Sequence, residues 1–255
     1  MNFKSAFWLF LFLLLISVPG FSQGEIDEQT KIFYRDEKSY AFFINNNGFG
    51  GNFRKGTRIN AFRKFIWEID MHYVKHAKEI KISNSATQLN QFVYGKMHFA
   101  WDIRGGAGFQ REMFRKIDKN GVAIRYFYNA GPTLMLLKPI YYEYPDNNGD
   151  IVDEKFSINS AQSPIGRSSF FMGIDEVFVD PGVYVKGGLS FEYSKRDNRL
   201  QALEIGAMAG VYLNELEIMY DNKTHFLFTL FISFRWGKII RGGRMKGVEL
   251  EGDEP

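Results

Sequence analysis

Histidines and their acidic neighbours are the residues of this chain best suited to catalysis. His98 lies four residues before Asp102, His72 lies two residues after Asp70, and His225 stands near the C-terminus. A base that is oriented by a carboxylate could activate a water molecule or a nucleophile for hydrolysis. No Gly-x-Ser-x-Gly motif accompanies these residues, so the sequence predicts no enzyme and no catalytic residue.

A metal site would need several of the same side chains close together. His72 and His76 are four residues apart, which on a helix would let both imidazoles bind one ion. On a strand the same spacing separates them by about 13 Å. The chain has no cysteine, and the glycine-rich stretches 48–51 and 105–108 do not precede a helix carrying Lys-Ser/Thr. We therefore expect no metal and no other cofactor.

Charged and polar residues recur at every second position in six segments, with large apolar residues between them. This period of two is typical of β-strands with one polar and one apolar face. It is clearest near the C-terminus, where Phe226, Phe228, Leu230, Ile232, Phe234 and Trp236 alternate with a mixed set that includes His225, Thr229, Ser233 and Arg235. The six segments are residues 64–73, 96–112, 122–137, 183–194, 202–213 and 225–236.

These segments are long enough to cross a bilayer as tilted strands. The mean hydropathy is −0.24 although 17% of the residues are aromatic, as expected when apolar residues alternate rather than cluster. We predict an all-β, antiparallel transmembrane β-barrel of eight strands, with residues 40–54 and 30–35 as the remaining two. Ten strands is the alternative, if residues 144–160 form a hairpin of their own.

The connections also fit a barrel, because such proteins have short turns on the periplasmic side and long loops outside. Short turns are expected at 54–58, 117–121 and 195–198, and long outer loops at 76–91 and 144–181. Residues 167–179 repeat apolar side chains at helical spacing, which predicts a short helix in the second long loop.

The chain begins with the features of a secretion signal. Lys4 precedes an apolar run from Ala6 to Val18, which Pro19-Gly20 ends; the run is too short to span a membrane. We expect a cleaved signal peptide at residues 1–22, the barrel at 23–238, and a flexible periplasmic tail at 239–255. The formal net charge of +3 gives no indication of nucleic-acid binding.

The polar faces of the segments would meet inside such a barrel. An eight-stranded barrel is just wide enough for side chains to fill, so opposite charges there should pair. We expect a lumen charge network made of Lys64, Glu68, Asp70, His72, Lys96, His98, Asp102, Arg104, Arg125, Lys186, Glu192, Glu204 and Arg235.

The signal peptide, the aromatic-rich alternating segments and the near-terminal Phe234-Arg235-Trp236 resemble the outer-membrane β-barrel class of Gram-negative bacteria. Residues 121–128 and 137–143 look like those of a subfamily of small barrels. The resemblance is architectural and covers nearly the whole mature chain. It implies the cell outer membrane as the location and assigns no role to any residue.

The sequence therefore predicts a non-enzymatic outer-membrane protein, a structural or scaffolding component of an envelope assembly with a closed, charge-filled lumen. A narrow channel for small solutes or ions is one alternative, and a lipid-modifying enzyme at the rim is another. The expected partners are outer-membrane lipid and other envelope proteins, the latter through loops 76–91 and 144–181.

Overall fold

The computed structural model describes residues 35–82, 92–116, 121–146, 150–157, 163–196 and 198–241. The predicted signal peptide lies outside these ranges, as do residues 242–255 of the predicted tail. The last strand continues to Arg241, so the ordered barrel extends past the expected limit at residue 238.

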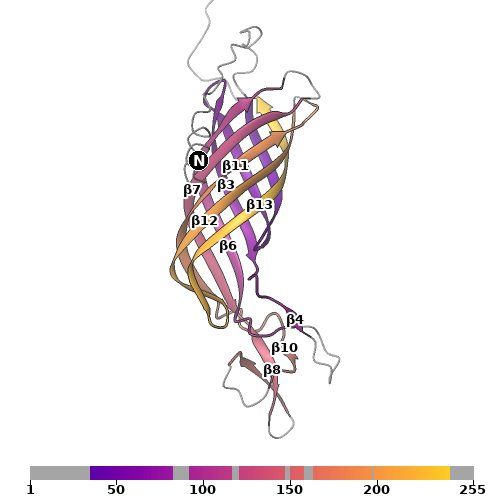
Figure 1. Ribbon diagram of the computed structural model, residues 1–255, viewed down its shortest axis with the longest axis vertical. Coiled ribbons are helices and arrows are strands. Elements are labelled where there is room, and N and C mark those ends of the chain that lie inside the picture. Colours follow the sequence, from indigo (N-terminus) through magenta and orange to yellow (C-terminus); the bar gives the residue numbers. More distant parts are fainter. Residues whose placement is uncertain are drawn as a thin grey trace, which may run out of the picture. The chain divides into compact units, whose positions relative to one another are not determined.

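Eight strands form a closed antiparallel barrel, in the ring order β1-β13-β12-β11-β7-β6-β3-β2. Figure 1 shows these strands slanting around the ring. The predicted eight-stranded barrel is thus confirmed. Its strands are β1 (Arg35–Asn45), β2 (Gly48–Arg58), β3 (Arg63–Val74), β6 (His98–Phe114), β7 (Ala123–Pro139), β11 (Phe178–Glu192), β12 (Arg199–Met219) and β13 (Asn222–Arg241).

The remaining described strands lie outside the ring in two small sheets. One sheet has the order β10-β8-β9 and the other pairs β4 with β5. Both sheets belong to the two long connections of the barrel. Their strands are β4 (Lys81–Ile82), β5 (Phe92–Val93), β8 (Tyr141–Pro145), β9 (Ile151–Lys155) and β10 (Gly166–Arg167).

Alternation along each ring strand separates a buried polar face from an exposed apolar face. On β3, Lys64 and Glu68 are buried while Trp67, Ile69 and Met71 are exposed. Because successive side chains of a strand point to opposite sides, closing the sheet directs one set into the lumen and the other set outward. The outward set is apolar on every long strand, and this is the inverse of a water-soluble protein.

The first hairpin differs from the prediction. Residues 40–54 do not form one strand, because the chain turns at Asn46 and Asn47 between β1 and β2. Asn46 hydrogen-bonds with Leu230 through both its backbone and its side chain, which holds this turn against β13. Of the expected strand at 30–35, residues 30–34 lie outside the described residues, and Arg35 begins β1.

The two ends of the barrel carry different connections. One end, here called the terminal end, holds Arg35 and Arg241 and the short connections 59–62, 115–122 and 193–198. The other, the loop end, holds the long connections 75–97 and 140–177 and the tight turns of β1–β2 and β12–β13. The turn expected at 54–58 is displaced to 59–62, since β2 continues to Arg58.

No helix occurs between residues 167 and 179, where the sequence predicts one. Gly166–Arg167 is β10, turns occupy residues 170–176, and β11 begins at Phe178. Phe170, one of the apolar residues at helical spacing, instead packs against Phe99, which is distant in sequence and lies on β6. Among the described residues, no helix is long and apolar enough to cross a membrane.

The hairpin considered within 144–160 does form, as β8 and β9, but outside the barrel. Its small sheet has its own apolar core, in which Tyr142 and Phe156 pack with neighbouring aromatic side chains. The Tyr142 hydroxyl lies 2.7 Å from Val93 O and 2.8 Å from Lys96 O, and its one proton is donated to these two carbonyl oxygens as alternatives. These contacts fasten the sheet to the first long connection, and burial raises the pKa of the Tyr142 hydroxyl.

Candidate functional site in the barrel lumen

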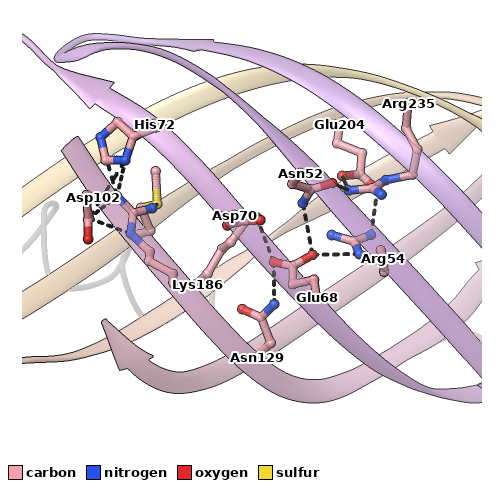
Figure 2. A network of polar contacts seen from close by, with 12 residues as sticks. Asn52, Arg54, Glu68, Asp70, His72, Asp102, Asn129, Lys186, Glu204 and Arg235 are labelled. Carbon is pink, nitrogen blue, oxygen red and sulfur yellow. Dashed lines mark hydrogen bonds and ion pairs between the residues drawn. The ribbon is translucent and has the colours of Figure 1, made fainter. Parts of the chain in front are cut away.

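The middle of the lumen holds a connected network of charged side chains, shown in Figure 2. Glu68 of β3 accepts hydrogen bonds from Arg54 Nε at 2.7 Å, from Lys186 Nζ at 2.7 Å and from Asn52 Nδ2 at 3.1 Å. Lys186 also lies 2.8 Å from Asp70 Oδ2. Asn129 of β7 donates to Glu68 as well, so this buried carboxylate joins side chains of four strands, β2, β3, β7 and β11.

Glu204 of β12 forms the second half of this network. It accepts hydrogen bonds from Arg54 Nη1 at 2.8 Å and from Arg235 Nε at 2.9 Å. All of these side chains are nearly inaccessible to solvent. The central network balances three cations against three carboxylates: Arg54, Lys186, Arg235, Glu68, Asp70 and Glu204.

A second cluster lies nearer the loop end. Arg104 Nε donates to Asp102 Oδ2 at 2.6 Å, and Arg104 Nη2 lies 2.6 Å from His72 Nδ1. An arginine can only donate, so this nitrogen of His72 carries no proton and the imidazole acts as an acceptor. Asp102 also accepts hydrogen bonds from Thr133 and, at 2.7 Å, from the Tyr212 hydroxyl.

A third cluster closes the terminal end of the lumen. Glu37 of β1 pairs with Lys64 and lies 3.7 Å from Arg125 Nη1. Arg125 in turn pairs with Glu192, which lies 3.5 Å from Lys116 Nζ. Charges of opposite sign thus alternate across this end as well.

Two apolar layers separate or cover these clusters. Phe43 and Phe231 meet edge to face inside the lumen, with ring centroids 6.4 Å apart, and pack with Ile66, Phe127 and Met208. At the loop end, Val74, Ala100, Met135, Leu137, Tyr212, Leu216 and Ile218 form a second buried cluster. These inward apolar residues were not among the predicted lumen residues. Phe127 interrupts the polar face of segment 122–137.

The structure brings together most of the predicted lumen residues but places two of them elsewhere. Lys96 lies at the loop end, where Nζ is 2.9 Å from Glu79 Oε2 and 2.6 Å from the Tyr73 hydroxyl. His98 Nδ1 lies 2.6 Å from Glu217 O. Both are therefore held at the rim, outside the three clusters.

Two important members of the lumen network were not predicted. Glu37 was placed in a connection and Arg54 at a turn, because the first hairpin was assigned wrongly. The signal that could have found them is the alternation within residues 36–44, where Glu37, Ser39, Ala41 and Phe43 are buried and the residues between them are not.

The pairings weighed for catalysis do not form among the described residues. His98 contacts the backbone of Glu217 rather than Asp102, and His72 contacts Arg104. His225 is about half exposed and lies 4.0 Å from Glu215. No group of three or more histidine or acidic side chains within the described part of the chain is placed to hold a metal ion.

The lumen is therefore occupied by charge-balanced clusters and buried apolar layers, and the outward face is apolar. The chain has the architecture of a small outer-membrane β-barrel. No protein-family model matches the sequence, and no curated protein matches it.

Among solved structures the barrel is similar to neisserial surface protein A (NspA), with 12% sequence identity and a TM-score of 0.37; the match covers 82% of this chain and 96% of that one. It is also similar to Ail, the attachment invasion locus protein of Yersinia pestis, in complex with the heparin analogue sucrose octasulfate. That match has 10% identity and a TM-score of 0.37, and covers 81% of this chain and 99% of Ail.

Proposed function

We propose that this protein is a closed, non-conducting β-barrel of the outer membrane that serves as a structural or scaffolding component of the cell envelope. The observation that carries the proposal is the filled lumen. The central ion-pair network of Glu68 and Glu204 lies between the apolar cluster at the loop end and the Glu37–Lys64 cluster at the terminal end. A permeant ion would have to displace paired charges and an apolar layer together.

The outward face supports the membrane location. Ile69, Val185, Val211, Phe228 and Ile232 are each 40–60% exposed and lie on four different strands. In water such a surface would promote aggregation, whereas in a bilayer it contacts lipid chains. The long connections favour the loop end as the extracellular side, because outer-membrane barrels have short periplasmic turns.

The scaffolding role rests on the two small sheets at the loop end. The sheet formed by β8, β9 and β10 has its own apolar core and is fastened by Tyr142 to the backbone of residues 93 and 96. A packed sheet presents a fixed surface to a partner, unlike a flexible loop. The long loops that contain these sheets are thus the proposed contact surface for envelope proteins.

The test is electrical recording of the purified protein in planar lipid bilayers. Proper folding is first established by a heat-dependent shift of gel mobility, which closed barrels show in detergent. The expected result is insertion without steady conductance at any applied voltage. Steady single-channel steps from the wild-type protein would contradict the closed lumen and favour the narrow channel instead.

A rim enzyme remains testable in the same preparation. His98→Ala and His225→Ala are expected to leave the acyl composition of the outer-membrane lipids unchanged, since neither histidine contacts a carboxylate within 3.5 Å among the described residues. A change in acyl composition caused by either variant and absent from its parent would contradict this expectation.

A further inference from the structure

Two cations at the loop end share one aromatic ring and have no carboxylate partner among the described residues. Lys138 Nζ lies 5.5 Å, and the Arg167 guanidinium carbon 5.4 Å, from the centroid of Phe99. Lys138 also lies 4.9 Å from the ring of Phe170. Within the described part of the chain, its side chain makes one hydrogen bond, a long contact of 3.4 Å to Pro139 O.

This arrangement differs from that of the other cations nearby. Lys96, which also approaches Phe99, pairs with Glu79 at 2.9 Å, and Lys155 pairs with Glu176 at 2.6 Å. Lys138 and Arg167 repel each other beside the ring they share. The attraction of each cation to the ring offsets only part of this repulsion energy. The loop-end segments outside the described residues, 83–91, 147–149 and 158–162, contain no Asp or Glu in sequence.

Lys138 lies where the apolar belt ends. On β7 the outward side chains Leu134 and Leu136 precede it, and in the register of β6 with β7 it stands opposite Phe99. Phe170 continues the apolar surface and contacts Phe171, whose side chain is 74% exposed. Lys138 is 8% exposed and Arg167 is exposed, so two positive charges lie beside the exposed rings of Phe170 and Phe171 at the level where lipid chains give way to headgroups.

We propose that Lys138 and Arg167 bind a phosphate group of a lipid headgroup in the outer leaflet, with the lipid chains packing against Phe170 and Phe171. Arginine offers a planar pair of donors to phosphate oxygens and lysine a point charge. Bound phosphate would offset the repulsion between the two cations. It would also supply an anionic hydrogen-bond acceptor, which neither cation has among the described residues. The inference rests on the proposed membrane location and orientation but is independent of whether the lumen conducts.

The test is native mass spectrometry of the full-length protein in detergent micelles, titrated with diphosphorylated lipid A, with dephosphorylated lipid A, or with inorganic phosphate. The double variant Lys138→Met/Arg167→Gln is compared with the control Lys155→Met/Lys223→Gln. The control also removes two positive charges at the loop end, but from lysines that pair with Glu176 and Glu215. A heat-dependent gel shift confirms that every variant is folded.

The wild type and the control are expected to retain phosphorylated lipid A in preference to the dephosphorylated form. The double variant should bind the phosphorylated form roughly thirtyfold more weakly, because each of the two charges lost near a membrane surface contributes about fivefold in affinity. Displacement of the lipid by inorganic phosphate would show that the phosphate group is sufficient, and its absence would show that the lipid chains contribute. Equal retention of both lipids, or equal weakening in the control, would overturn the proposal.

Discussion

Arg235 of β13 and Glu204 of β12 form a two-point ion pair inside the barrel, with Nε 2.9 Å from Oε1 and Nη2 3.0 Å from Oε2. The same guanidinium donates to Ser39 of β1 and to Asn52 of β2. One side chain therefore connects four strands on both sides of the seam where the last strand of the barrel meets the first. The buried charge of Arg235 is fully paired only when β13 meets β1, so closure of the ring and burial of this charge depend on each other.

Removing the charge of Glu204 should weaken the barrel strongly. In Glu204→Gln, Arg235 and Arg54 lose their shared carboxylate while both remain buried, and breaking a buried pair in this way costs about 3–5 kcal/mol. The measurement is the urea concentration at which the protein in lipid vesicles loses its heat-dependent gel shift. Glu215→Gln is the matched control on the same strand, because its exposed partner Lys223 lies 3.8 Å away and such pairs contribute roughly 0–1 kcal/mol. Equal midpoints for the two variants would contradict a structural role of the buried pair.

The apolar layer in the lumen should respond to volume rather than to charge. Phe231→Ala removes one ring of the pair with Phe43 and leaves a cavity, which costs about 3–5 kcal/mol in well-packed interiors. Phe231→Leu retains most of the volume and should cost less than about 1.5 kcal/mol. Unfolding in urea distinguishes the two variants, and an equal loss in both would indicate that the layer is loosely packed.

Two neighbouring glycines should differ sharply in their tolerance of alanine. A Cβ at Gly131 would lie 2.1 Å from the backbone oxygen of Gly105, whereas a Cβ at Gly105 would meet no atom within 4 Å. Backbone cannot move aside as a flexible side chain can, so Gly131→Ala should cost about 3 kcal/mol or more. Gly105→Ala should fold as the wild type does. The heat-dependent gel shift of each variant after refolding measures the outcome, and normal refolding of Gly131→Ala would refute the close approach of β6 and β7.

The orientation of the barrel can be measured with single cysteines, because the natural chain has none. Asp175→Cys lies in the second long connection and Asn60→Cys in the turn between β2 and β3, and both positions are exposed. A membrane-impermeant maleimide should label Asp175→Cys on intact cells and Asn60→Cys only after permeabilisation. The reverse pattern would place the long loops in the periplasm.

The barrel itself was predictable because period-two alternation is a local property of the chain. On β3, β12 and β13 the pattern is unbroken over ten residues or more, so the strands and their faces followed from residue type alone. The first hairpin was not, because Gly48, Gly50 and Gly51 carry no side chain that could indicate a face. Asn46 and Asn47 form the turn, but asparagine alone does not distinguish a two-residue turn from other irregular structure.

The small sheet of β8, β9 and β10 shows the same limit at a larger scale. The β8–β9 hairpin was recognisable from its turn residues, but whether it joined the ring or stood outside depended on packing that no local pattern contains. Its aromatic core with Phe156 and Tyr142 decided that it forms a separate sheet. Within 167–179, the spacing of the apolar residues predicted a helix. The sequence does not show that Phe170 packs against the distant Phe99.

By itself, the sequence determined which side chains of most strands face the lumen, since alternation assigns each side chain to one side of a strand before any strand has a neighbour. Only the tertiary structure decided which of them pair. Arg54 meets Glu204 across 150 positions of the chain and Lys186 meets Glu68 across 118. Such contacts depend on strand register and on closure of the ring, because the position of a charge across the lumen is set by the whole barrel and not by its neighbours in sequence.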